Sequence, residues 1–198
     1  MVCLAGDFML HKAAAGTLPG NGRTKNHEMV RAFVDSSTHA IIGFLVWALV
    51  ENPSILGDFR KWLNCFAAAA LAASVDLDHF WAAGELNLKK AMHLTKRPPF
   101  HNTSLVCALT LVFAFLQKWK PKMWMFSMMF LCSWLSHHLR DANHRGLWVF
   151  PFGHTPLFSK KLYIMCILIL AAFVRIAVVV HQGSTGLRST EGFAKVIL

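Results

Sequence analysis

Histidine and aspartate residues recur in this chain at spacings that place them on one face of a helix. His137, Asp141 and His144 are spaced i, i+4, i+7, and Asp35 and His39 repeat the i, i+4 step. Imidazole nitrogens and carboxylate oxygens together suit Zn²⁺, Mn²⁺ or Fe²⁺. An i, i+4 pair is also typical of simple helix stabilisation. The spacing therefore makes these residues candidate ligands of a divalent metal ion, with a structural role as the alternative.

Further polar residues lie at the ends of other apolar segments. Asp76, Asp78 and His79 form an Asp-x-Asp-His run that closes one segment. His101 opens the next segment, and Asp7 precedes the first loop. Asp76 and His79 share a helical face, whereas Asp78 points elsewhere if the helix continues. We therefore expect the helix to end or unwind at this run.

Apolar segments separate these polar groups. Of 198 residues, 55% are hydrophobic and 15% are charged, whereas soluble domains have about 25% charged residues. We expect an all-α, multi-pass transmembrane bundle: a single domain over residues 1–183, with a short N-terminal apolar segment, and a polar tail over 184–198. Each expected span is close to the ~20 residues that a helix needs to cross a bilayer. The spans are residues 32–50, 62–83, 103–119, 123–139 and 162–181.

Alternating passage through the membrane would bring the polar groups to one face. The loops 12–31, 84–101 and 139–161 on that face carry twelve Lys and Arg, against seven on the other side. The positive-inside rule then predicts that the polar face is cytosolic. Ionisable groups at a lipid boundary are costly unless they are paired or bind a metal. Their gathering predicts a membrane-embedded polar site.

The basic charge indicates a lipid partner. The net charge is +10, but the Lys and Arg residues are scattered between apolar segments, so no nucleic-acid partner is expected. Anionic headgroups account for juxtamembrane bases. Arg97, Arg140 and Arg145 lie near the polar face and could clamp an anionic or phosphoester ligand; headgroup contact is the alternative. The five cysteines include no CxxC pair, so a thiolate zinc site is not indicated.

Three motifs carry a resemblance to known families. They are Ser-Val-Asp-Leu-Asp-His at 74–79, Arg-Pro-Pro-Phe-His-Asn at 97–102 and Ser-His-His-Leu-Arg-Asp at 136–141. Together they resemble the motif set of bacterial LexA-binding, inner-membrane-associated metal-dependent hydrolases. The transmembrane protein 267 family of animals is more similar still, over roughly residues 30–180. The chain departs from the bacterial pattern where Lys96 replaces a His and His144 replaces a Thr.

The resemblance implies a set of metal ligands. That set is His39, Asp76, Asp78, His79, His101, His137 and Asp141. Asp35 and His144 are additional candidates from their spacing, and Arg97 is the candidate contact for an anion or substrate.

Three functions are compatible with these residues. A polar or metal-bound network could hold together a non-enzymatic membrane protein. A bound metal could instead lower the pKa of a water and support hydrolysis of an ester or phosphoester, as in a lipid-like substrate. A transporter is disfavoured because transporters place their sites near the bilayer centre. We expect a multi-pass membrane protein with a metal site, and a metal-dependent hydrolase as the alternative.

Overall fold

The computed structural model describes residues 23–51 and 58–196, and the side chains of residues 27–51 and 58–184 within them. Asp7 and the N-terminal apolar segment lie outside the described residues. The chain is mostly helical, as expected. Its elements are α2 (Arg23–Glu51), α3 (Phe59–Ser74), α4 (Leu77–Ala83), α5 (Leu88–Met92), the 3-10 helix η2 (Pro99–His101), α6 (Thr103–Leu116), α7 (Met123–Arg145), β1 (Trp148–Val149), β2 (Gly153–His154) and α8 (Lys160–Val196).

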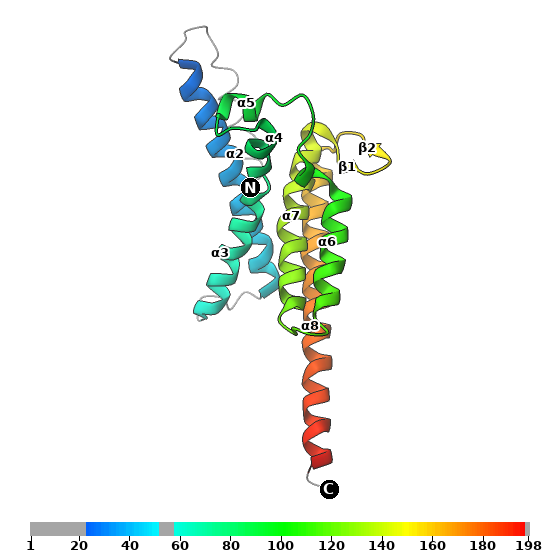
Figure 1. Cartoon of the computed structure of the whole chain (residues 1–198). Helices are drawn as coiled ribbons and strands as arrows, with labels where there is room; N and C mark the ends of the chain where they lie inside the picture. The colour runs from blue at the N-terminus through cyan, green and yellow to red at the C-terminus, as the bar shows by residue number, and fades with distance from the viewer. Residues whose placement is uncertain (1–22, 52–57, 197–198) are drawn as a thin grey trace.

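Helix α7 is the centre of the bundle. It contacts α2, α3, α6 and α8, and most of its residues between Ser127 and Ala142 are buried. The short helices α4 and α5 and the antiparallel β1–β2 hairpin lie at one end of the long helices, and α8 extends beyond the other end (Figure 1). Residues from the second half of α7 therefore face several elements at once.

Helices α2 and α3 approach closely because α2 has a glycine, Gly43, where it packs against α3. A Cβ atom on Gly43 would lie 2.6 Å from Ala72 Cβ and 2.9 Å from the Ala68 carbonyl oxygen. Small residues allow this close approach in helical bundles. The contact brings His39, one turn before Gly43, next to the end of α3.

The second apolar segment is broken where the Asp-x-Asp-His run begins. Helix α3 ends at Ser74, and α4 starts at Leu77 after a turn that contains Asp76. The expected continuous span over residues 62–83 is therefore two helices in the structure. The predicted end of the helix at this run is confirmed, and it gives Asp76 and Asp78 different directions.

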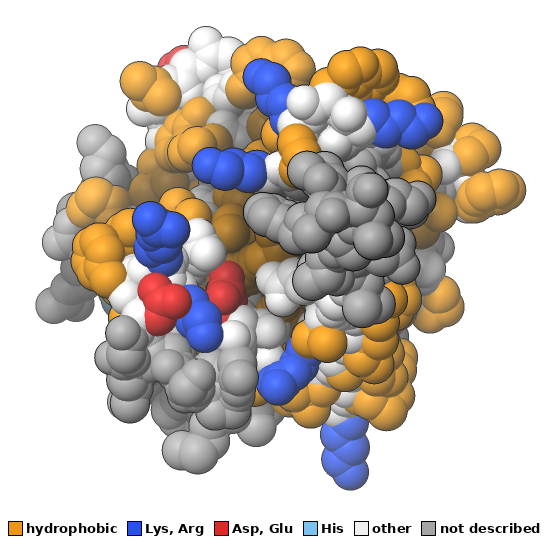
Figure 2. All heavy atoms as spheres, turned by 90° about the horizontal axis from the view of Figure 1, so that it is seen from below, with side chains coloured by type: hydrophobic (Ala, Val, Ile, Leu, Met, Phe, Trp, Pro, Cys, Tyr) orange, Lys and Arg blue, Asp and Glu red, His pale blue; other side chains and the backbone are white. Residues whose placement is uncertain are grey.

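Two helices in the described part of the chain are long and apolar enough to cross a membrane. They cover His27–Glu51 and Lys160–Ser184. Helix α8 exposes apolar side chains between Leu162 and Val180, including Leu168, Phe173 and Ile176, and exposed apolar patches of this kind mark contact surfaces. The end of the molecule opposite α4 shows Lys and Arg side chains over a largely apolar surface (Figure 2).

The remaining helices differ in length from the expected spans. Helix α6 has 14 residues, fewer than the ~20 that cross a bilayer. Helix α7 continues past residue 139 to Arg145, and α8 continues past 183 to Val196. The extra turns of α7 keep Asp141 on the same helix as His137.

Candidate metal centre

Four side chains from three parts of the fold converge at the α4 end of the bundle. They are Asp76 from the α3–α4 turn, His101 from η2, and His137 and Asp141 from α7. The Nε2 atom of His137 lies 3.5 Å from Asp76 Oδ1 and 3.5 Å from Asp141 Oδ2. The Nε2 atom of His101 lies 3.8 Å and 3.5 Å from the same two oxygens. The two Nε2 atoms are 3.4 Å apart.

These separations are typical of ligand atoms that bind the same metal ion. A tetrahedral ion with bonds of ~2.1 Å holds its ligand atoms about 3.4 Å apart. The five distances above lie between 3.4 and 3.8 Å. The His/Asp groups could therefore hold a metal ion. Two separate triads have mutually close ligand atoms, and each contains two of the four side chains: His39, His137 and Asp141, and Asp76, His79 and His101.

Both histidines of the cluster, His101 and His137, have a polar partner at Nδ1, the ring nitrogen that points away from the cluster. His137 Nδ1 lies 2.8 Å from the carbonyl oxygen of Ala72. Because a carbonyl only accepts hydrogen bonds, Nδ1 carries a proton, and Nε2 is the ring nitrogen that faces the cluster. His101 Nδ1 lies 3.4 Å from Asp78 Oδ2. Such partners fix the tautomer and orientation of metal-binding histidines.

Asp78, which the resemblance implies is one of the metal ligands, lies behind His101 as seen from the four side chains of the cluster. It is buried and accepts a hydrogen bond from the Phe100 backbone N–H at 2.7 Å. Its other oxygen lies 3.2 Å from His79 Nδ1, which is 4.0 Å from Asp76 Oδ1. Asp78 thus ties η2 and α4 to the cluster.

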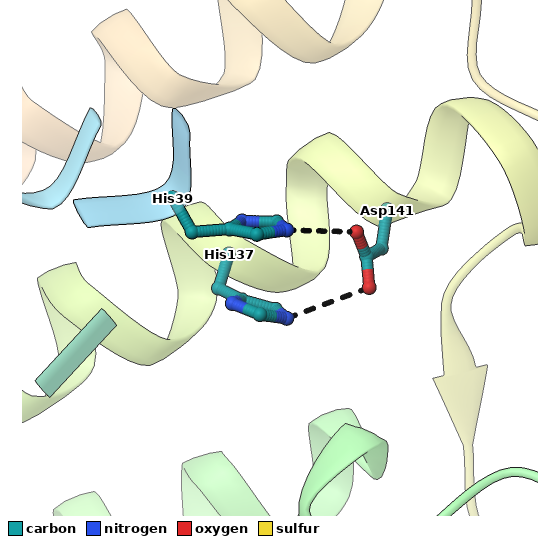
Figure 3. A group of neighbouring side chains, drawn as sticks. All are labelled: His39, His137 and Asp141. Atoms are coloured by element: carbon teal, nitrogen blue, oxygen red, sulfur yellow. Dashed lines mark ion pairs between the residues drawn. The ribbon is translucent and has the colours of Figure 1, made fainter. Parts of the chain in front are cut away.

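His39 lies on the opposite side of Asp141 from His101. Its Nε2 is 3.3 Å from Asp141 Oδ1, while Asp141 Oδ2 faces His137 (Figure 3). The rings of His39 and His137 stack, with centroids 3.5 Å apart. Asp141 therefore presents Oδ1 to His39 and Oδ2 to His137.

Arg140 is buried beside His39. Its guanidinium NH1 lies 2.9 Å from His39 Nε2 and forms an ion pair with Asp35 Oδ1. Only 1% of Arg140 is exposed. The expectation that Arg140 clamps an anion together with Arg97 and Arg145 is wrong, because its head group points into the protein.

A cavity of about 560 Å³ opens onto the cluster. Its polar lining includes the candidate residues Asp35, Asp76, His79, His101, Asp141 and His144. Three arginines, Arg31, Arg97 and Arg145, lie on its wall, together with apolar residues that include Leu77, Phe80 and Met92. Arg97 also donates a hydrogen bond to the Gly146 carbonyl oxygen at 2.9 Å. Carboxylates, imidazoles, cations and apolar surface thus meet in one cavity.

Comparison with known proteins assigns the chain to a family. It is 38% identical to transmembrane protein 267 of Xenopus laevis over 146 residues, which are 71% of this chain and 66% of that protein. It is 38% identical to transmembrane protein 267 of Danio rerio over 147 residues, covering 71% of this chain and 63% of the relative. The Mus musculus protein is 33% identical over 148 residues. The chain belongs to the transmembrane protein 267 family.

The matched region covers slightly less than two thirds of these relatives' own length. No protein-family model matches the chain, so the resemblance to the bacterial hydrolases rests on its motifs alone. No solved structure matches it. These relatives are named transmembrane proteins, and the described residues of this chain include two helices long and apolar enough to cross a membrane.

Charge inside the cluster of this transmembrane protein 267 member favours a cation. Burial lowers the pKa of His101, but hydrogen bonds and charges of Asp141 and Asp78 outweigh it and raise the pKa to about 9. Burial would raise the pKa of Asp141, but the imidazoles of His137, His39 and His101 hold it well below its usual range. At neutral pH, without a metal, Asp141 is ionised and His101 carries a proton at the position where a cation is favoured.

Two contacts of the site were not apparent from the sequence. The Ala72 carbonyl, which orients His137, has no side-chain signal. Arg140 did have one: it follows His137 by three positions and so shares its buried helical face.

Proposed function

We propose that this chain is a multi-pass integral membrane protein in which Asp76, His101, His137 and Asp141 bind one divalent metal ion. The observation that supports it is the five distances of 3.4 to 3.8 Å among their ligand atoms, which are close to those in a tetrahedral site. Two nitrogen and two oxygen ligands at this spacing favour Zn²⁺ over Mn²⁺ or Fe²⁺. Asp78 and the Ala72 carbonyl orient the two histidines, and His39 completes the surroundings of Asp141.

A metal at this position would join distant parts of the bundle. Its ligands come from the α3–α4 turn, η2 and α7, so the ion would fix a broken helix and a loop against the central helix. Metal binding that depends on the folded arrangement adds its free energy to folding. In this role the ion stabilises the polar end of a membrane bundle.

The proposal is tested by metal content after extraction in mild detergent. Wild-type protein is expected to retain about one zinc ion per chain by elemental mass spectrometry, and Asp76→Asn and His137→Ala are expected to lose it. His93→Ala is the control, because His93 is exposed and its ring contacts the Lys89 carbonyl oxygen outside the cluster. The site would be refuted if wild-type protein contained no stoichiometric metal both as purified and after incubation with saturating Zn²⁺.

The cavity favours a second function, metal-dependent hydrolysis. A catalytic zinc keeps a position for water, whose pKa it lowers towards ~7. In this role the water would bind as a fifth ligand beside the four side chains. Asp76, His101 and Asp141 face the cavity, so a water there would be adjacent to the centre. Arg31, Arg97 and Arg145 would bind an anionic head group, and Leu77, Phe80 and Met92 would contact an apolar chain. The substrate that fits this lining is a lipid-like phosphoester, with an ester as the alternative. The similarity to the bacterial motifs suggests hydrolysis but no particular substrate.

Hydrolysis is tested with zinc-loaded protein and phosphoester lipids in mixed micelles. Turnover is expected in the wild type, and Arg97→Gln is expected to raise KM more than it lowers kcat because Arg97 binds the anion in ground and transition states alike. Arg60→Gln, at the far end of the bundle, is the control. Metal-loaded wild type that hydrolyses neither phosphoester nor ester lipids would exclude the enzyme while leaving the metal centre standing.

A further inference from the structure

We propose that the guanidinium group of Arg140 occupies the position of a second metal ion beside the centre described above. The inference rests on the proposed function, because the first ion is the one bound by Asp76, His101, His137 and Asp141. It adds that the chain holds the ligands of a two-metal site and fills one half of it with a fixed organic cation.

Asp141 has the geometry of a bridging carboxylate. Its Oδ2 atom lies 3.5 Å from the Nε2 atoms of both His101 and His137. Its Oδ1 atom faces the other way and lies 3.3 Å from His39 Nε2 (Figure 3). One oxygen therefore belongs to the proposed centre and the other to a separate group of ligands.

That separate group has ligand atoms at metal-binding distances. It consists of Asp141 Oδ1, His39 Nε2 and Asp35 Oδ1. His39 Nε2 lies 3.3 Å from the first oxygen and 3.8 Å from the second, within the same range as the distances in the centre. Two metal ions that share a carboxylate lie about 3.5–4 Å apart in two-metal sites.

Arg140 occupies this second group. Its NH1 contacts both Asp35 Oδ1 and His39 Nε2. A guanidinium has only donors and stays charged at any physiological pH, so His39 must accept the bond through an unprotonated Nε2. The histidine is thus held in the form that would bind a metal, while the arginine supplies the positive charge.

Because Arg140 is buried, its guanidinium group is hard for a second metal ion to displace. Arg140 and His39 are each 1% exposed, so a second ion would have to displace a buried charge that is already paired. Truncating one partner of such a pair leaves the others uncompensated. Without Arg140, the Asp35 carboxylate and the His39 Nε2 atom would lose the cation that lies beside them. We therefore expect Zn²⁺ to bind in its place.

The test compares zinc stoichiometry in the full chain, purified in mild detergent and titrated with Zn²⁺ alone. The wild type and Arg140→Lys are expected to bind one ion per chain, because both retain a cation at this position. Arg140→Ala is expected to bind two, and Arg140→Ala combined with Asp35→Asn to return to one. The melting temperature of Arg140→Ala is expected to rise more with added Zn²⁺ than that of the wild type.

Each outcome decides the proposal. Two ions in the wild type, or one ion in folded Arg140→Ala, would overturn the role of Arg140 while the first centre stands. No ion in the wild type would instead remove the proposed function and this inference with it. If Arg140→Ala unfolds, recovery of its fold by Zn²⁺ supports the proposal, and failure to recover at saturating Zn²⁺ overturns it.

Discussion

Single residues in this protein act by orienting one another. His101 is the clearest example: Asp78 lies behind its Nδ1 atom, and Asp141 and Asp76 lie in front of its Nε2 atom. The ring is therefore fixed on both edges, and the carboxylates around it stabilise the protonated imidazole when no metal is bound. Asp78 acts through the Nδ1 edge of His101 and not at the metal position, so its effect should be on affinity rather than on the number of ions.

Asp78→Asn is expected to weaken zinc binding by about 10- to 100-fold, because the carboxylate that orients His101 is lost. Competition with a chromophoric chelator measures the change. Glu85→Gln, which removes a carboxylate from an exposed ion pair with Lys90, should leave the affinity unchanged. Equal affinities of Asp78→Asn and wild type would mean that Asp78 does not orient a ligand.

Zinc affinity is expected to rise with pH between 6 and about 9. The pKa of His101 is raised to about 9, so in this window a proton must leave the ring before a metal binds, and the affinity gains about tenfold per pH unit for one released proton. The same chelator competition at several pH values measures the slope. A flat profile would contradict displacement of the His101 proton, and His101→Ala should show a smaller slope.

Elements determine whether these residues meet. The helix break at Asp76, the 3-10 turn that carries His101 and the extension of α7 to Arg145 each place one ligand. The α2–α3 contact at Gly43 places His39 and Ala72 beside α7. These features are local, but the site requires all of them together.

Gly43→Ala is expected to destabilise the bundle by about 1–3 kcal/mol, because the new methyl group would overlap Ala72. Thermal unfolding in detergent measures it. Gly183→Ala is the matched control within a helix: among the described residues, a Cβ there meets open space, and the change should stabilise α8 by up to ~1 kcal/mol. Equal unfolding temperatures of the two variants would show that α2 and α3 do not depend on a glycine contact.

At the scale of the whole molecule, the polar centre and the long apolar helices must share one membrane orientation. The cavity, α4, α5 and the hairpin lie at one end of the bundle, and the α6–α7 turn lies at the other (Figure 1). The outer surfaces of α2 and α8 are rich in exposed apolar side chains between these ends. Proposed insertion along the bundle axis therefore puts the site on one face of the membrane.

Cysteine labelling tests this orientation in a background without the native cysteines. Glu85→Cys and Phe152→Cys should react with a membrane-impermeant maleimide from the same compartment, expected to be the cytosol, because both sites lie at the cavity end and are exposed. Lys120→Cys, in the α6–α7 turn, should react from the opposite side. If Glu85→Cys and Phe152→Cys were labelled from different sides, α4 and the end of α7 would lie on opposite faces of the membrane, and the proposed site could not form.

The amino-acid sequence by itself determined the helical class, the membrane character, the helix end at Asp76 and the set of histidines and aspartates from which the site is built. These follow from composition and from helical spacing, which are local properties. Only the tertiary structure decided which of those residues face one another: Asp78 turns behind His101, and Arg140 enters the protein to contact His39 and Asp35. Those choices depend on contacts between residues as far apart as 35 and 140, and such contacts are set by the packing of whole helices, which no local spacing encodes.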